Sequence, residues 1–158
     1  MTAQDSNELS REAHRRLAVS LFNRSWELLA LQRTVPEDDE LIHTVHASAH
    51  HWRACGGAAA NLARGENQCA RVYAALGRGE PAVHHAQRCL ALVEAGGDGF
   101  EDWDRASALE VTARAWLASG DKPKASEFYR QTQVALADIA DPEDRAVIAG
   151  QLAELGLG

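Results

Sequence analysis

Apolar side chains recur every three or four residues along most of the chain, the spacing that places them on one face of an α-helix. Prolines and glycine-rich turns interrupt this pattern and divide it into seven segments. Each proline lies near the start of a segment, where the first turn of a helix tolerates it best. We predict helices over residues 8–33, 38–55, 59–76, 81–95, 102–118, 123–139 and 142–155. We expect residues 1–7, which are mostly polar, to be disordered.

Composition predicts an all-α fold in a single domain of 158 residues. Hydrophobic residues make up 46% of the chain but aromatic residues only 6%, so alanine and leucine must fill the core, which favours closely packed helices. The net charge of −7 argues against a nucleic-acid partner, because phosphate binding needs clustered lysine and arginine. The sequence contains neither an apolar run long enough for a membrane span nor a secretory signal, so we expect a cytoplasmic protein with free thiols.

The predicted helix over residues 38–55 contains four of the seven histidines. Its apolar face, which we expect to lie in the core, consists of Leu41, Val45, Ser48, Trp52 and Cys55. A second face carries His43, His46 and His50, with His51 at its edge. Imidazoles one turn apart can bind a single metal ion. The alternative interpretation is that this face is exposed to water and binds no ligand.

The chain also contains an internal repeat. The pattern HHxxxC occurs at residues 50–55 and again at residues 84–89, 34 residues apart. Small residues, an aromatic residue and a turn glycine recur in matching order at residues 63–96 and 106–139. They are Ala70, Tyr73, Gly77, Ala82, Ala86 and Cys89 in the first unit, and Ala113, Trp116, Gly120, Ala125, Tyr129 and Thr132 in the second. On these residues the chain resembles the tetratricopeptide-repeat family over about 100 residues. It is also similar to short bacterial helical proteins with HxxH, ARGE and HHAxxCL segments, which imply no activity.

The resemblance to tetratricopeptide repeats implies helix pairs stacked into a right-handed α-α superhelix, a fold usually used to recognise other proteins. First helices line the concave surface of such an array, which here would carry Arg64, Asn67, Arg71, Glu110 and Arg114. Arg71 and Arg114 would take equivalent positions and hold a carboxylate or phosphate of a partner, whereas the alternative is a solvated polar face. A homodimer formed through the apolar parts of the first helix is a further hypothesis.

The register of the repeat also positions several reactive side chains. Cys55 and Cys89 take the place of a buried alanine, so we expect small core residues rather than nucleophiles. His51 and His85 fall at the edge of the core and would share a site if neighbouring units bring them together. Glu66 faces inward and needs a cation, which is either an arginine (Arg16, Arg53 or Arg71) or a metal ion.

Two hypotheses about function follow from these patterns. The leading one is a helical-repeat protein with a transition-metal site, for which zinc, copper and iron are all compatible. Its candidate ligands are His43, His46, His50, His51, Glu66 and His85. Any catalysis would take place at that ion, because no motif for nucleophilic catalysis is present, and whether the protein is an enzyme stays open. The alternative is a protein-interaction scaffold that binds neither metal nor substrate.

Overall fold

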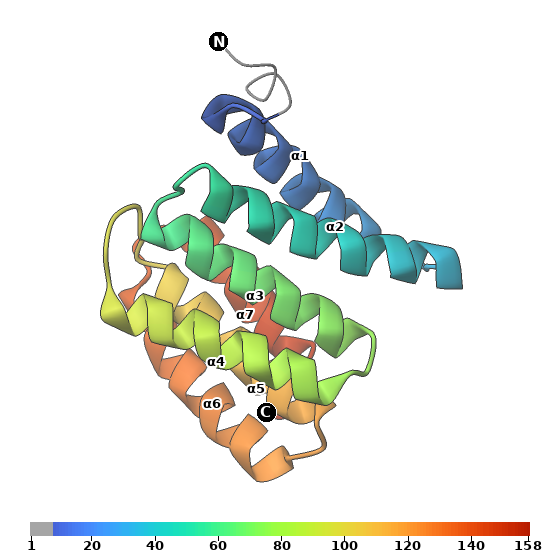
Figure 1. The fold of residues 1–158 in the computed structure, drawn as a ribbon. Helices are drawn as coiled ribbons and strands as arrows, with labels where there is room; N and C mark the ends of the chain where they lie inside the picture. The colour runs from blue at the N-terminus through green and yellow to red at the C-terminus, as the bar shows by residue number, and fades with distance from the viewer. Residues whose placement is uncertain (1–7) are drawn as a thin grey trace.

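The computed structural model describes residues 8–158, which form seven α-helices, one 3-10 turn and no strand (Figure 1). The helices are α1 (Arg11–Leu29), α2 (Val35–Ala54), α3 (Ala59–Ala75), α4 (Gly79–Ala95), α5 (Asp104–Ala118), α6 (Lys122–Ala135) and α7 (Pro142–Ala153). The 3-10 turn, Leu136–Asp138, directly continues α6. The all-α fold is thus confirmed. The disorder predicted for residues 1–7 concerns a stretch outside the described residues.

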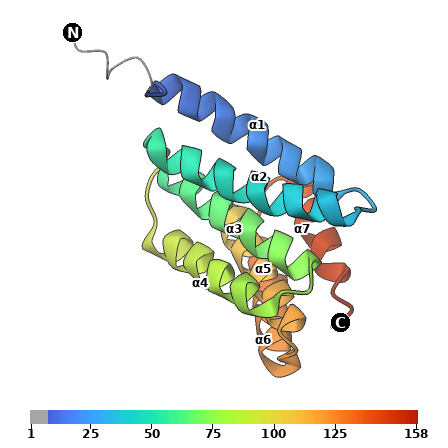
Figure 2. The same ribbon diagram turned by 45° about the vertical axis from the view of Figure 1, so that its right-hand side comes forward.

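Consecutive helices pack in three pairs, α1 with α2, α3 with α4, and α5 with α6 (Figures 1 and 2). The pairs stack in chain order, because α2 also packs against α3 and α4 packs against α5. The first helices α3 and α5 contact each other as well, and α7 follows the last pair and packs against α5 and α6. No helix in residues 8–158 is long and apolar enough to cross a membrane.

Local hydrogen bonds cap several helix ends. Asp141, the predicted N-cap of the last helix, accepts a hydrogen bond from the backbone N–H of Glu143. The second helix begins at Val35, earlier than predicted, because Thr34 and Glu37 form a capping box at its start. The first helix ends at Leu29, earlier than predicted, and the side chain of Arg33 folds back to donate to its last carbonyls. The prolines lie near the starts of α2, α4, α6 and α7, as predicted.

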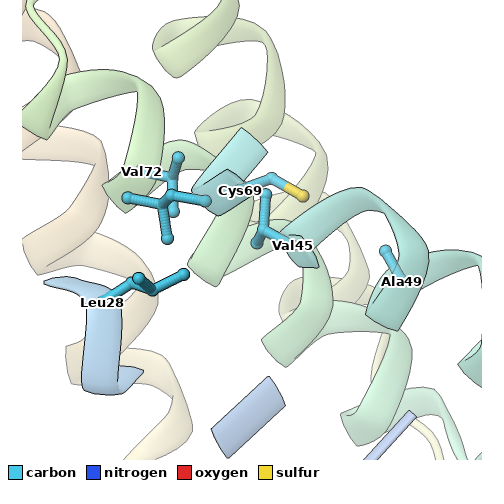
Figure 3. Close-up of a cluster of buried hydrophobic side chains, with 6 residues drawn as sticks. Leu28, Val45, Ala49, Cys69 and Val72 are labelled. Carbon is cyan, nitrogen blue, oxygen red and sulfur yellow. The ribbon is translucent and has the colours of Figure 1, made fainter. Parts of the chain in front are cut away.

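The core consists mainly of small aliphatic side chains, as the composition predicts. One cluster joins α1, α2 and α3 and contains Leu28, Leu41, Val45, Ala49, Cys69 and Val72 (Figure 3). The apolar face predicted for the histidine-rich helix is confirmed, since all five of its residues are buried. On the polar side of α2, His43 and His50 are exposed to solvent, whereas His46 and His51 are partly buried.

Candidate functional site

Three side chains that can bind a metal come together where α2, α3 and α4 meet. His46, Cys69 and His85, one from each helix, each offer a ligand atom, and these atoms lie within 4.8 Å of one another. The ring centroids of the two histidines are 5.4 Å apart. Among the described residues no other group of three histidine, cysteine or carboxylate side chains is as close. Cys69 is fully buried, whereas both imidazoles are partly exposed.

A buried carboxylate holds one of these imidazoles in place. Oε2 of Glu66 lies 2.6 Å from Nδ1 of His85, and its Oε1 accepts a hydrogen bond of 3.2 Å from Nε of Arg88. Burial by itself raises the pKa of Glu66, but the hydrogen bond from His85 and the charges of His85 and Arg88 outweigh it, so the pKa lies below its ordinary value. Glu66 is therefore ionised and can only accept hydrogen bonds. In the neutral ring of His85 this contact places the proton on Nδ1, so an ion would bind through Nε2.

The inward position predicted for Glu66 is confirmed, and so is its need for a cation. Arg53 is one partner, with Nη1 at 3.7 Å from Oε1, as the sequence suggested. The other two predicted arginines pair elsewhere, Arg16 with Glu12 and Arg71 with Glu110. Arg88 and His85 take their place, because both lie on α4, which packs against α3.

Tyr73 holds the second imidazole. Its hydroxyl lies 2.8 Å from Nε2 of His46, and its ring stacks on that of His85 with centroids 5.7 Å apart and planes 5° apart. Burial, and next the charge of His85, lower the pKa of His46, which favours the neutral form that binds metals. Each imidazole thus has one ring nitrogen held by a protein partner and the other left for an ion.

The thiol of Cys69 lies on the apolar side of the site. Burial, and next the charge of Glu66, raise the pKa of Cys69 to about 12, so the free side chain is a neutral thiol. Its neighbours in the core include Val45, Ala49 and Val72 (Figure 3). A bound transition metal would displace the proton, because a coordinating thiol is deprotonated. Cys69 is therefore suited to bind a metal and unsuited to act as a free nucleophile.

The three ligand atoms could bind one transition-metal ion if they moved slightly closer together. Metal–nitrogen bonds of about 2.0 Å and metal–sulfur bonds of about 2.3 Å place neighbouring ligand atoms roughly 3.5 Å apart. The ligand atoms of His46, Cys69 and His85 lie within 4.8 Å of one another, so binding an ion requires them to approach by about 1 Å. His46 and His85 are partly exposed, so this movement would fall to the two imidazoles, whereas Cys69 is buried in the core.

The other histidines of the predicted metal set lie apart from this group. His43 is exposed on α2 and His50 is exposed farther along the same helix. His51 faces α1, where its Nδ1 lies 2.8 Å from Nδ1 of His14. Burial, and next the charges of His14 and His50, lower the pKa of His51. The predicted set is thus divided, because α2 is packed between α1 and α3 and its histidines face different neighbours.

Cys69, Tyr73 and His14 were not among the predicted site residues. A signal for the first two was present, because Glu66, Cys69 and Tyr73 follow the i, i+3, i+7 spacing and share one face of α3. The predicted burial of Cys55 and Cys89 is confirmed, and all three cysteines are free thiols.

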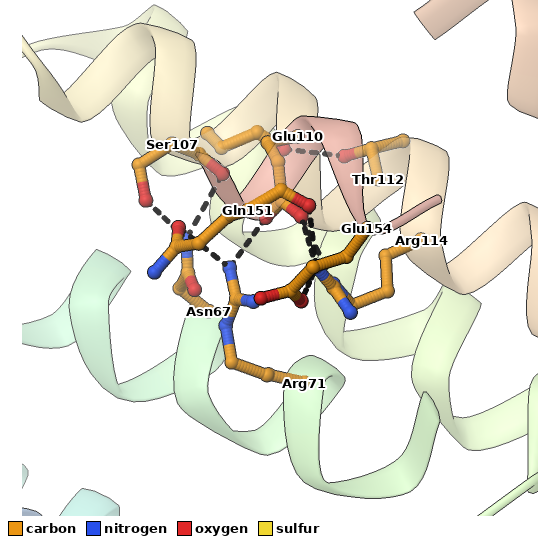
Figure 4. Close-up of polar contacts among 9 residues, drawn as sticks. Asn67, Arg71, Ser107, Glu110, Thr112, Arg114, Gln151 and Glu154 are labelled. Atoms are coloured by element: carbon orange, nitrogen blue, oxygen red, sulfur yellow. Dashed lines mark hydrogen bonds and ion pairs between the residues drawn. The ribbon is translucent and has the colours of Figure 1, made fainter. Parts of the chain in front are cut away.

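The arginines predicted to hold a partner are paired within the protein (Figure 4). Arg71 forms a buried ion pair with Glu110, whose other carboxylate oxygen accepts a hydrogen bond of 2.9 Å from Nε of Arg114. Arg114 also donates to the backbone carbonyl of Gln151 at 2.9 Å and to Glu154 at 3.0 Å, both near the end of α7. The C-terminal helix therefore engages the two arginines that we expected a partner to contact.

The other residues predicted to line the concave surface, Arg64 and Asn67, also have partners within the protein. Arg64 makes a two-pronged ion pair with Asp104, at 2.9 and 2.7 Å, and its guanidinium lies over the ring of Trp103 at 4.5 Å from the centroid. Asn67 donates to the backbone and hydroxyl oxygens of Ser107. These contacts hold α3 against α5.

A cavity of about 370 Å³ remains between α1, α3, α5 and α7. Trp26 and Trp103 line it together with the aliphatic side chains of Val147 and Ile148. Arg71 also borders it, and the Nε atom of this side chain is buried with no hydrogen-bond partner. The cavity is therefore largely apolar.

No protein-family model and no curated protein matches the chain. Its structure is similar to the crystal structure of a TPR-like protein from Chlorobium tepidum TLS, with a TM-score of 0.67 over 94% of this chain and 99% of that chain. The two sequences are 17% identical, so the likeness concerns the fold alone. The paired helices and this likeness together show that the chain has the tetratricopeptide-like fold that its repeat predicts.

Proposed function

We propose that this chain is a tetratricopeptide-like scaffold that binds one transition-metal ion through His46, Cys69 and His85. The observation that carries the proposal is the convergence of three ligand atoms from three helices within 4.8 Å. An ion at this point would join α2, from the first helix pair, to both helices of the second pair.

The partners around the ligands support the proposal. Metal-binding histidines usually donate their second ring N–H to a carboxylate or carbonyl, and the contact between His85 and Glu66 is of this kind. The ion pair of His85 with Glu66 would by itself explain a structural role for these two residues. It gives no reason for His46 of α2 and Cys69 of α3 to approach the same point, and metal binding does.

Metal analysis of the purified protein tests this proposal. The protein is prepared without a nickel column, treated with a chelator, and titrated with zinc or cobalt under reducing conditions. We expect one ion per chain, with His85→Ala weakening binding by at least about 100-fold. His84→Ala is the matched control, since His84 is the exposed neighbour on the same helix. Uptake below about 0.2 ion per chain in the wild-type protein would exclude the site.

The cavity beside α7 favours a second candidate function, the binding of a partner's peptide segment. Its two indole rings and the aliphatic side chains beside them suit an apolar side chain of a partner. Val147 lines this cavity and is 59% exposed, so it can be changed without disturbing the core. We expect Val147→Glu to abolish capture of a protein partner while Val134→Glu, at a site on α6 that is 74% exposed and outside the cavity, retains it. Equal capture by both variants would exclude this cavity.

Three finer expectations accompany these proposals. We place the protein in the cytoplasm, where its three free thiols would stay reduced. The net charge of −7 makes nucleic acid an unfavourable partner. A homodimer would use the outer face of α1, where Leu17 and Val19 are 38% and 42% exposed, and light scattering would report twice the mass of one chain.

A further inference from the structure

We infer that the ion is monovalent copper, held in a three-coordinate site by the thiolate of Cys69 and the imidazoles of His46 and His85. This inference rests on the proposed metal site and goes beyond it by naming the ion and its coordination. Three properties of the site carry it: the number of donors, the charge around them and the apolar surroundings of the sulfur.

The number of donors favours copper(I). Within residues 8–158 no fourth histidine, cysteine or carboxylate joins the group. The carboxylate that contacts His85, Glu66, is already engaged by that ring and by Arg88. Structural zinc takes four protein ligands in a closed tetrahedral site. Copper(I) is stable with three ligands, and one thiolate with two imidazoles is a donor set typical of protein-bound copper.

The charge of the site also favours a monovalent ion. One thiolate neutralises copper(I), whereas zinc(II) with the same ligands keeps one positive charge. The shell next to the ligands already contains two cations, Arg53 and Arg88, against the single carboxylate of Glu66. Both arginine side chains are more than half exposed, so solvent screens part of their charge, but a further positive charge beside the buried Cys69 is still costly.

The surroundings of the sulfur favour a soft ion without bound water. Cys69 is 1% exposed, and its cluster consists otherwise of aliphatic side chains that include Val45, Ala49 and Val72 (Figure 3). Zinc with three protein ligands needs a water molecule in the fourth position. The apolar cluster limits the access of that water on the sulfur side of the site, and a thiolate selects soft ions such as copper(I).

A copper(I) titration with X-ray absorption spectroscopy tests the inference on the full chain. Reduced protein receives one equivalent of copper(I) without oxygen and competes with the chelator bicinchoninate, and zinc is titrated in parallel. We expect one copper(I) per chain, with two nitrogen ligands and one sulfur ligand in the absorption spectrum. Copper(I) should bind at least about 100-fold more tightly than zinc(II).

A pair of serine variants identifies the sulfur. Cys69→Ser should weaken copper(I) binding by at least about 100-fold. Cys89→Ser is the matched control, because Cys89 is also 1% exposed and burial likewise raises its pKa to about 12. It should bind copper(I) like the wild-type protein. The wild-type spectrum reports the sulfur ligand independently if either variant fails to fold.

The outcomes separate this inference from the proposed function. If zinc binds at one ion per chain but copper(I) shows no preference, the ion is wrongly named and the metal site stands. Full copper(I) affinity in Cys69→Ser, or an absorption spectrum without a sulfur ligand, overturns the inference and also removes Cys69 from the proposed site. If neither ion binds the wild-type protein, both the site and its ion are excluded.

Discussion

At the scale of single residues, Glu66 orients a candidate ligand rather than binding an ion itself. Its carboxylate holds the Nδ1 side of the His85 ring, so a metal would bind through the other ring nitrogen. The amide of glutamine has nearly the same shape but no charge. We expect Glu66→Gln to weaken metal binding by about 10- to 100-fold, the usual effect of losing such a partner. Competition titrations measure this, with Glu80→Gln, an exposed residue of α4, as control. Equal affinities of the two variants would show that Glu66 serves packing only.

The contact between His14 and His51 makes stability depend on pH. Their Nδ1 atoms are 2.8 Å apart, so one nitrogen must donate and the other accept. Burial, and next the charges of His14 and His50, lower the pKa of His51 in the folded protein. In the unfolded chain it is about 6.5, so below that pH the unfolded state binds more protons and stability falls.

We therefore expect the free energy of unfolding to decrease from pH 7 to pH 5, and to decrease less in His51→Gln. Urea denaturation at several pH values in a chelating buffer measures this difference. The pKa of His46 is also lowered and contributes with the same sign, so the comparison between the two proteins isolates His51. Identical pH profiles would contradict the assignment to His51.

At the scale of helices, the turns of successive pairs touch at one glycine. A Cβ atom at Gly79, at the start of α4, would collide with the backbone of Ser119 at the end of α5. We expect Gly79→Ala to lower the free energy of unfolding by about 1–3 kcal/mol, the usual cost of overpacking.

Gly150, within α7, offers the matched control. It has open space where a Cβ would lie, so Gly150→Ala should stabilise the protein by roughly 0.5–1 kcal/mol through helix propensity alone. Chemical denaturation measures both variants. Equal effects of the two substitutions would show that the turns do not pack as closely as described.

The attachment of α7 depends on a carboxylate outside that helix. Glu110 of α5 is fully buried between Arg71 and Arg114, which reach Gln151 and Glu154 of the C-terminal segment (Figure 4). Glu110→Ala would leave two arginines without their shared counter-charge. We expect a loss of about 3–5 kcal/mol of stability, as for other buried pairs broken on one side. Thermal or denaturant unfolding measures it, and Glu94→Ala, at an exposed position of α4, should change stability little. A small loss in both would contradict the role assigned to Glu110.

At the scale of the whole molecule, an ion at His46, Cys69 and His85 would connect the first two helix pairs and stabilise them together. A ligand that binds only the folded state stabilises it by about 2.7 kcal/mol when its free concentration is 100 times Kd. We expect zinc or copper(I) at such an excess to raise the unfolding temperature of the wild-type protein. His85→Ala should show no increase, and scanning fluorimetry or calorimetry compares the two. An equal increase in the variant would assign the effect to binding elsewhere.

The sequence predicted the helices well because their signals are local. Asp141 and Pro142 determine the start of α7 through hydrogen bonding and backbone geometry within one turn. The predicted end of the first helix was too late, because apolar spacing continues to Leu31 while Arg33 folds back on the helix end. The repeat of HHxxxC indicated stacked pairs, and the structure confirms the pairs.

The candidate site was predicted only in part. His46, Glu66 and His85 belong to the predicted metal set and lie together, whereas Cys69 was missed because a cysteine on an apolar face resembles any core residue. Arg71 was expected to face a partner. The structure pairs it with Glu110, and α7 lies close enough for Gln151 to contact it.

The sequence alone therefore determined which segments are helical and which face of each helix is apolar. Those properties depend on neighbours within one or two turns of the same helix. Only the tertiary structure decided that His46 meets His85 while His51 meets His14. Whether two side chains on different helices converge depends on how the helices cross and on which side chains fill the space between them. That is a property of the packed molecule, to which residues far apart in the chain contribute together.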